Sequence, residues 1–162
     1  MDRDKNKILE LPILFESDVL EGKIKGKYRK RNIKNFKSGQ QFNYFLDVAR
    51  ESFEDRNISN ALNSAHTIFV NAVMGFTPHF SEGSAALDEK IDLNKAALKL
   101  YGGGDTLQEF KDLCPGLYLS VLDDSDYYFF TGGGTVLKAI EEGSPYSLAP
   151  VKALIDNDGK TP

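Results

Sequence analysis

Residues 117–130 read LYLSVLDDSDYYFF, and this stretch decides the fold class. The runs 117–122 and 127–130 are rich in apolar and aromatic side chains of the kind that favours strands. The four residues between them, Asp-Asp-Ser-Asp, are turn formers. The stretch therefore predicts a C-terminal β-hairpin. Because the chain before it carries helical periodicity, we expect an α+β fold.

A central cluster of three or four helices is predicted by apolar side chains that recur every three or four residues. The expected helices are residues 40–55, 57–76, 84–101 and 105–113. The connection near residues 55–57 is short, so the first two helices are expected to form an antiparallel pair. After the hairpin, residues 135–142 are expected to form a short helix and residues 150–155 a final helical turn.

The N-terminal part of the chain is expected to contribute one strand. Every odd position from 23 to 31 is Lys or Arg, and Leu20, Ile24 and Tyr28 lie at even positions. A period of two is the period of a strand, which would carry its cations on one face. A helix is the alternative, because lysines also recur from Lys23 to Lys37 at spacings of four and three. Gly22 and Gly26 favour the strand, since each would weaken a helix by roughly 1 kcal/mol.

Length and composition indicate a single domain over residues 1–162, with 1–7 and 156–162 as flexible ends. A chain of 162 residues with 41% hydrophobic content can build one core without disulfides. Cys114 is the only cysteine, so no internal bridge can form and a reducing, cytoplasmic location is expected. The start of the chain does not read as a signal peptide, and no apolar run is long enough to cross a bilayer, so no membrane partner is expected.

Charge is distributed unevenly along the chain. Residues 23–37 hold eight of the 20 basic residues and no acidic one, although the net charge is −4. We interpret this basic segment as a surface that binds an acidic protein or a second copy, which predicts a non-enzymatic interaction or assembly component. Nucleic-acid binding by the same residues is the alternative. The candidate partner-binding residues are Lys23, Lys25, Lys27, Tyr28, Arg29, Lys30, Arg31 and Lys34.

A glycine-rich turn gives a third hypothesis, a small enzyme or ligand-binding domain. Thr131, Gly132, Gly133, Gly134 and Thr135 follow a predicted strand and precede a predicted helix, so their backbone N–H groups could cradle a phosphate. The turn lacks the spacing of a Walker or dinucleotide motif. The other glycine triplet, residues 102–104, is interpreted as the C-terminal cap of a helix.

Catalytic and metal-binding residues are not predicted. The carboxylates at residues 123, 124 and 126 lack the glycine and glutamate of a calcium loop and are expected to form a solvated turn. His66, His79 and Cys114 have no evident catalytic partners in the sequence. No cofactor is expected either.

Overall fold

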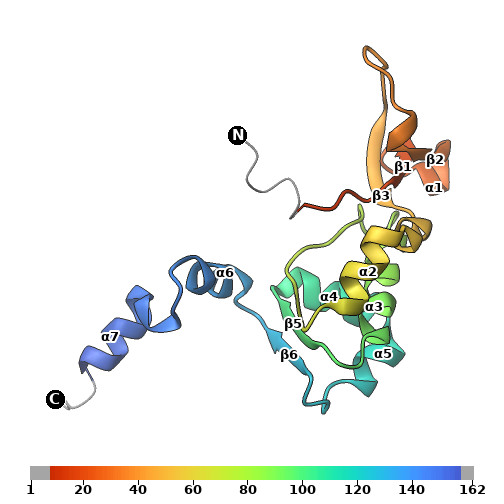
Figure 1. Ribbon diagram of the computed structural model, residues 1–162. Coiled ribbons are helices and arrows are strands. Elements are labelled where there is room, and N and C mark those ends of the chain that lie inside the picture. Colours follow the sequence, from red (N-terminus) through yellow and green to blue (C-terminus); the bar gives the residue numbers. More distant parts are fainter. Residues whose placement is uncertain (1–7, 158–162) are drawn as a thin grey trace.

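The computed structural model describes residues 8–157 and shows two small sheets linked by helices (Figure 1). Sheet A is antiparallel, in the order β2-β1-β3, and consists of β1 (Ile13–Ser17), β2 (Tyr28–Asn32) and β3 (Tyr44–Val48). Sheet B is parallel, in the order β4-β5-β6, and consists of β4 (Thr67–Val70), β5 (Leu98–Gly102) and β6 (Tyr127–Phe130).

Helices precede, connect and follow the strands. The α-helices are α1 (Gly22–Lys25), α2 (Arg56–Ser64), α3 (Glu82–Leu93), α4 (Gly104–Leu113), α5 (Pro115–Ser120), α6 (Gly133–Glu141) and α7 (Ala149–Asn157). Three short 3-10 helices are η2 (Ile33–Asn35), η3 (Arg50–Glu54) and η4 (Pro145–Ser147). From residue 8 to residue 157 the structure holds no helix that is long and apolar enough to cross a membrane.

The main core lies between sheet B and the helices α3, α4 and α5. Val70, Tyr101 and Tyr127, one from each strand, are buried in one cluster with Ile91 of α3 and Phe110 of α4. The Tyr101 and Phe110 rings stack with centroids 4.7 Å apart. Because β4, β5 and β6 are joined by these helices, the unit is a parallel β-α-β arrangement with its helices on one face.

The α+β class is confirmed, since helices and strands both form and the sheets include an antiparallel one. An N-terminal strand is also present, as are the helices predicted at 105–113, 135–142 and 150–155, which are α4, α6 and α7. The predicted flexible ends fall largely outside the described residues, and residues 156 and 157 belong to α7.

The N-terminal strand predicted from the cations at odd positions 23 to 31 is wrong in its first half. Residues 22–25 form one helical turn, α1, and only β2 is extended. The carboxylate of Asp18 accepts a hydrogen bond of 2.8 Å from the Lys27 backbone N–H, and the Asp18 N–H donates to the Lys27 carbonyl at 3.1 Å. These bonds close a loop between β1 and β2, so the alternating lysines at 23, 25 and 27 do not share a strand face.

The central helices are shorter than predicted, and the first does not form. Residues 40–55 contain β3 and η3, because β3 pairs with β1 in sheet A. The segments predicted as helices at 57–76 and 84–101 each divide into a helix and a following strand, α2 with β4 and α3 with β5. In each case the end of the apolar stripe joins a parallel sheet, whose pairing overrides the helical spacing.

The predicted C-terminal β-hairpin is also wrong. Residues 115–120 form α5, which begins with Pro115 in the first turn, where proline is tolerated. Tyr127–Phe130 is a strand as predicted, but it pairs in parallel with β5. Tyr118 of α5 packs against the main core instead of lying in a sheet.

Asn94 holds the ends of α2 and α3 together. Its side-chain amide donates to the carbonyls of Leu62 at 2.8 Å and Ala65 at 2.9 Å. We expect Asn94→Ala to lower the free energy of unfolding by about 2 kcal/mol, because two carbonyls lose a buried donor. Asn63→Ala, at an exposed position of α2, should cost less than about 0.5 kcal/mol. Urea denaturation of both variants would test this, and equal losses would contradict it.

Candidate functional site

The carboxyl ends of the three parallel strands meet at one glycine-rich edge. β4 is followed directly by Asn71, β5 ends in the triplet Gly102–Gly104, and β6 leads into the segment Thr131–Thr135. We call these residues the glycine edge. Ligands of open parallel sheets bind at the carboxyl ends of the strands, so this edge is the candidate functional site.

The glycines allow the three chain segments to approach one another closely. A Cβ atom on Gly133 would lie 2.0 Å from Asn71 Oδ1 and 2.8 Å from the backbone nitrogen of Gly103. The Gly103 N–H donates to the Phe130 carbonyl at 2.8 Å, which ties the end of β5 to the end of β6. Gly103 also has a φ of +102°, a conformation that side chains rarely allow. The packing at this edge therefore requires glycine at positions 103 and 133.

Two helices begin at the glycine edge without a side-chain cap. Gly103 precedes α4 and Gly132 precedes α6, and neither has a side-chain oxygen to cap the first-turn N–H groups. These N–H groups and the positive end of each helix dipole attract anions. The edge therefore presents backbone N–H groups of the kind that bind phosphate or carboxylate groups in other proteins.

The five predicted phosphate-binding residues lie at this edge. Gly133 is buried, whereas Thr131, Gly132, Gly134 and Thr135 are exposed. The sequence interpretation of residues 102–104 as a helix C-cap is wrong, because this triplet ends β5 and begins α4. Asn71 was not among the residues predicted from the sequence. The glycine edge itself had a usable sequence signal, because both glycine triplets stand at the start of a helix.

An acidic pocket of about 380 Å³ lies beside the glycine edge. α4 contributes three carboxylates to it, from Asp105, Glu109 and Asp112, and the loop after β4 forms the opposite wall. The Thr77 hydroxyl donates a hydrogen bond to the buried Glu109 carboxylate. The pocket is therefore negative, and a bare phosphate would be repelled there unless a cation accompanied it.

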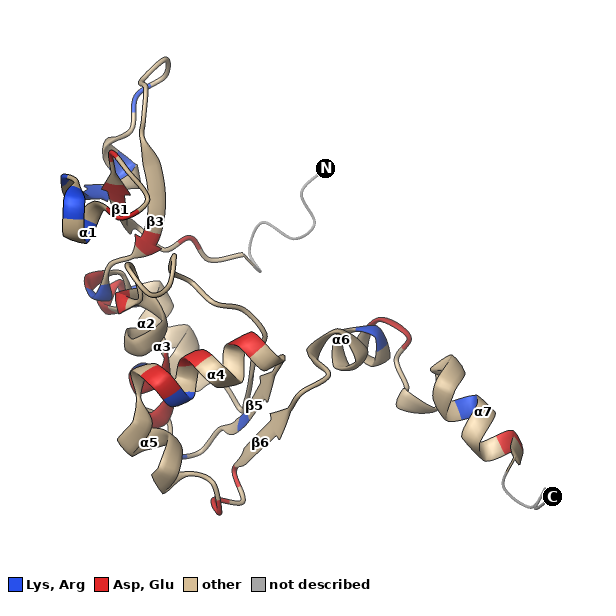
Figure 2. Ribbon diagram, turned by 180° about the vertical axis from the view of Figure 1, so that it is seen from behind, with Lys and Arg blue, Asp and Glu red and all other residues tan. Residues whose placement is uncertain are grey.

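The predicted partner-binding residues lie along α1, β2 and η2, where Lys and Arg gather (Figure 2). Several of these cations are neutralised inside the molecule. Arg29 Nε lies 2.9 Å from the buried Glu16 carboxylate, and Arg31 Nε lies 3.5 Å from it. The hydrogen bond from Arg29 and a second one from the Asn43 backbone lower the pKa of Glu16.

Three lysines of the basic segment are also engaged. Lys30 Nζ lies 2.6 Å from a Glu51 oxygen, and Lys34 Nζ lies 3.6 Å from one of Asp55. Lys23 Nζ stands 5.1 Å above the centroids of the Phe15 and Phe80 rings. Tyr28 is half-exposed on β2 and packs edge-on against Phe80. Within the described part of the chain, only Lys25 and Lys27 of the predicted set show no ion pair or ring contact.

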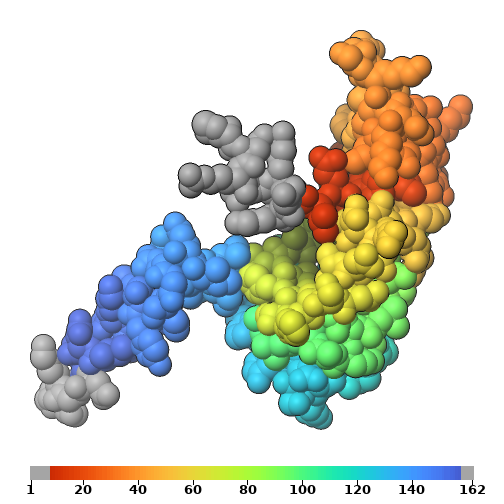
Figure 3. Space-filling model, in the orientation of Figure 1, coloured from red at the N-terminus to blue at the C-terminus, as the bar shows by residue number. Residues whose placement is uncertain are grey.

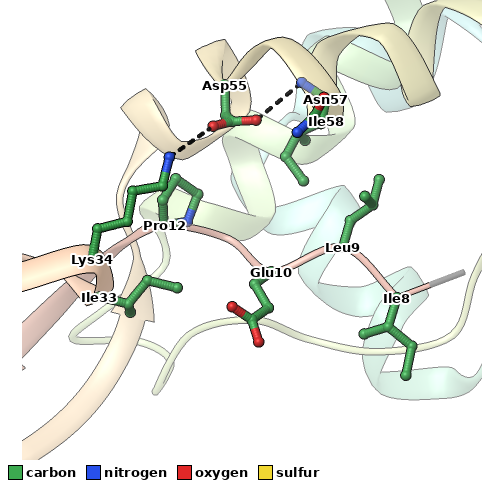
Figure 4. A pocket seen from close by; sticks show the side chains of 9 residues that line it. All are labelled: Ile8, Leu9, Glu10, Pro12, Ile33, Lys34, Asp55, Asn57 and Ile58. Atoms are coloured by element: carbon green, nitrogen blue, oxygen red, sulfur yellow. Dashed lines mark hydrogen bonds and ion pairs between the residues drawn. The ribbon is translucent and has the colours of Figure 1, made fainter. Parts of the chain in front are cut away.

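A larger hollow of about 670 Å³ lies between the N-terminal segment and the start of α2 (Figures 3 and 4). Ile8, Leu9 and Ile58 give it an apolar part, and Lys34 and Asp55 close one end through their ion pair (Figure 4). Asp55 also caps α2, accepting a hydrogen bond from the Asn57 N–H at 3.0 Å. The Lys34 and Asp55 side chains that line this hollow are thus already paired.

The histidines and the cysteine do not form a nucleophilic site. His66 lies just before β4, whereas the His79 ring stacks on Phe76 with centroids 6.5 Å apart. Cys114 is buried, and burial raises the pKa of its thiol to about 11. Among residues 8–157 no group of three or more His, Cys, Asp or Glu side chains is placed to hold a metal ion.

Comparison with known proteins identifies an enzyme family. The sequence model of the phosphoglycerate kinase family matches residues 3–143. Phosphoglycerate kinases of two Thermus thermophilus strains are 33% and 32% identical over 104 residues, which is 61% of this chain and 24% of each relative. The solved phosphoglycerate kinase of Coxiella burnetii is similar in fold, with a TM-score of 0.61 and 23% identity, over 87% of this chain and 33% of that one.

These matches overturn the function predicted from charge. The relatives are kinases, so the prediction of a non-enzymatic interaction or assembly component is wrong, and the nucleic-acid alternative is not favoured. The chain spans about a quarter of the length of the curated relatives it matches. Since the family model covers most of its residues, the chain belongs to the phosphoglycerate kinase family.

Proposed function

We propose that the glycine edge binds a phosphate group of the ligand on which a phosphoglycerate kinase-type enzyme acts. The observation that carries this proposal is the convergence of Asn71 with two uncapped helix N-termini at the carboxyl ends of three parallel strands. Backbone N–H groups at such positions bind phosphate without a basic side chain. The family membership supports it, because kinases transfer a phosphoryl group.

Phosphoryl transfer depends on positioning and on charge neutralisation more than on covalent chemistry by the protein. The glycine edge supplies fixed dipoles that orient a phosphate. A magnesium ion would offset the charge of the phosphate oxygens, and such ions are held by one or two carboxylates together with those oxygens. Asp105 is exposed in the first turn of α4 and fits that role. This arrangement also accounts for an acidic pocket beside a phosphate site.

We assign one side of the phosphoryl transfer to the glycine edge. A kinase must hold two substrates in line, and the segment matched in each phosphoglycerate kinase relative is 24% of that relative. This chain therefore supplies one side of the reaction, the phosphate-binding edge.

A cytoplasmic location accords with a kinase that has one cysteine. Binding of an acidic surface by Lys25 and Lys27 stays a prediction.

Gly133→Ala is expected to weaken phosphate binding by about tenfold or more, because the new methyl would displace Asn71 and the Gly103 backbone. Gly134→Ala is the matched control: apart from its chain neighbours and the backbone of its own helix, no atom lies within 4 Å of its added Cβ, and its φ is not positive. Titration calorimetry and thermal shift with ADP, ATP and inorganic phosphate would measure the effect. A ligand at 100 times its Kd should stabilise the chain by about 2.7 kcal/mol.

Two results would contradict the proposal. One is the absence of any thermal shift with all three ligands at millimolar concentration. The other is equal binding by Gly133→Ala and Gly134→Ala, provided that circular dichroism shows both variants to be folded.

A further inference from the structure

The loop between β1 and β2 carries apolar side chains that stay in solvent. It covers residues 18–27 and includes the short helix α1, and we call it the β1–β2 loop. Ile24 is 70% exposed, Leu20 is 39% exposed and Val19 is 38% exposed. Single apolar residues are normal on a protein surface, but these three stand within one loop of ten residues. The β1–β2 loop therefore concentrates exposed apolar surface.

Buried contacts fix the conformation of this loop. Its two ends are joined by hydrogen bonds of 2.8 and 3.1 Å between Asp18 and the Lys27 backbone. The buried Ser17 hydroxyl donates to the Val19 carbonyl at 2.6 Å. Gly22 packs so closely on Ser17 that an added Cβ would lie 1.7 Å from the Ser17 Oγ. These contacts hold the loop in a conformation that leaves its apolar side chains exposed.

Lysines alternate with the apolar residues of the β1–β2 loop. Lys23 and Lys25 flank Ile24, and Lys27 ends the loop. All three lysines are exposed, and Lys25 and Lys27 show no ion pair or ring contact within residues 8–157. Three lysines and two carboxylates give the loop a net charge of +1. The charge favours an anionic partner, but only weakly, so apolar contact must supply part of the affinity.

The β1–β2 loop lies at the outer margin of the molecule. Figures 1 and 2 show the protein from opposite sides, and both place α1 at the edge of sheet A, away from sheet B. Figure 2 also shows that Lys and Arg gather on α1 and on the strand beside it. An external surface can therefore reach the loop without contact with the glycine edge.

We propose that the β1–β2 loop adsorbs to a membrane surface that contains anionic lipids. Ile24, Leu20 and Val19 enter the boundary between headgroups and acyl chains, and Lys25 and Lys27 contact the anionic headgroups. Lysine suits this position, because its stem lies along apolar material while its ammonium group stays in water. The expected absence of a membrane partner concerned spanning segments, and adsorption of an exposed loop requires none.

An acidic polypeptide is the competing occupant, since it would attract the same lysines. Peptides bind mainly in grooves or beside free strand edges. The exposed aliphatic side chains stand instead on the four-residue helix α1 and the residues just before it, which form neither. A lipid interface accepts separate protruding side chains without a matching shape, so it fits this loop better. Membrane contact goes beyond the proposed function, because the glycine edge lies on sheet B and takes no part in it.

Sedimentation of the full chain with lipid vesicles tests the proposal. Vesicles of phosphatidylcholine with about 30% phosphatidylserine should bind the chain, whereas phosphatidylcholine alone should bind it about tenfold less tightly or worse. Binding should weaken as the salt concentration rises from about 50 to about 300 mM, because salt screens the lysines. Since a few side chains make the contact, the affinity should be low, and lipid concentrations up to about 10 mM are needed.

Substitutions in the loop should change this affinity in both directions. Ile24→Asp should weaken binding by about tenfold or more, because it replaces an inserted apolar side chain with a charge. Lys25→Glu should weaken it by about twentyfold, since each charge near an anionic surface changes the affinity by about fivefold. Glu21→Gln should strengthen it by about fivefold for the same reason. Glu21 is exposed and its side chain makes no cap hydrogen bond to α1, so this variant keeps the loop intact.

The matched controls carry the same changes on the helices around sheet B. Leu119→Asp lies on α5 and Lys111→Glu on α4, both at exposed positions. Each should change the affinity for the vesicles by less than about twofold, because the position lies away from the loop. Gly133→Ala should also leave vesicle binding unchanged. Circular dichroism of each variant verifies that it is folded.

No binding to the phosphatidylserine vesicles would overturn the proposal, as would equal losses in Ile24→Asp and Leu119→Asp. Binding to polyglutamate that Lys25→Glu weakens, without binding to vesicles, would assign the loop to an acidic polypeptide. Vesicle binding that is lost in Gly133→Ala would assign the headgroup contact to the glycine edge and refute this inference alone. Vesicle binding by a chain that binds no nucleotide or phosphate would refute the proposed function alone.

Discussion

Asp88→Asn is expected to stabilise the protein above pH 7 by up to about 4 kcal/mol. Asp88 is only 5% exposed on α3, where it accepts a hydrogen bond of 3.0 Å from the Tyr101 hydroxyl. Burial, together with the nearby Glu109 and Glu89, raises its pKa to about 7. The shift of about three pKa units corresponds to about 4 kcal/mol between the two protonation states.

The direction of the pH dependence follows from linkage. The folded protein holds the Asp88 proton up to about pH 7, whereas the unfolded chain releases it above about pH 4, so unfolding releases a proton between these values. Stability is therefore lost as the pH rises from about 4 to about 7. Asparagine stays neutral and still offers an oxygen to Tyr101, so the variant should not show this loss.

Urea denaturation of wild type and Asp88→Asn at pH 5, 6, 7 and 8 would measure the difference. Asp112→Asn is the control, since Asp112 is exposed on α4 and should leave the profile unchanged. Carboxylates with lowered pKa values, such as Glu16, act in the opposite direction and only at more acidic pH. Parallel profiles for wild type and Asp88→Asn would show that Asp88 does not titrate in this range.

Asp47→Ala is expected to destabilise the protein by about 3 kcal/mol. Asp47 is buried on β3, and its carboxylate accepts from the N–H groups of Val48 and Glu82, each at 2.7 Å, and of Gly83 at 3.2 Å. Ser81, the residue before α3, provides no side-chain cap. The cap of α3 thus comes from sheet A, and alanine would leave several N–H groups unpaired.

Asp55→Ala is the appropriate comparison for this second prediction. Asp55 caps α2 within its own segment through one bond, to the Asn57 N–H at 3.0 Å, so its loss should cost about 1 kcal/mol. Chemical denaturation of the two variants gives the measurement. A loss for Asp47→Ala no larger than that for Asp55→Ala would mean that the carboxylate does not join sheet A to α3.

Local sequence signals succeeded where the structure is local. α4, α6 and α7 each form within a few residues, and their apolar spacing and flanking glycines identified them. The glycine turn at Thr131–Thr135 was visible for the same reason. The residues that the turn contacts could not be predicted in this way. Asn71 lies 60 positions before Thr131 and Gly102 lies 29 positions before it, and they meet the turn only through the parallel pairing of β4, β5 and β6.

The errors share one physical cause. Phe42 and Phe45 stand three positions apart, as on a helix, yet they pack around Phe36 beside sheet A. The apolar run at 117–122 has strand composition, yet it covers the core as α5. Periodic apolar spacing indicates that side chains pack together, and a short segment can pack the same side chains as a helix or as a strand.

By itself, the sequence determined the α+β class, the helices α4, α6 and α7, the strand Tyr127–Phe130 and the glycine-rich turn after it. These features depend on backbone preferences and on contacts between near neighbours. Only the tertiary structure decided that the strands of sheet B run parallel, that two glycine triplets and Asn71 form one edge, and that half of the basic segment is neutralised by carboxylates such as Glu16 and Glu51. Such contacts join residues distant along the chain, so no local pattern specifies them.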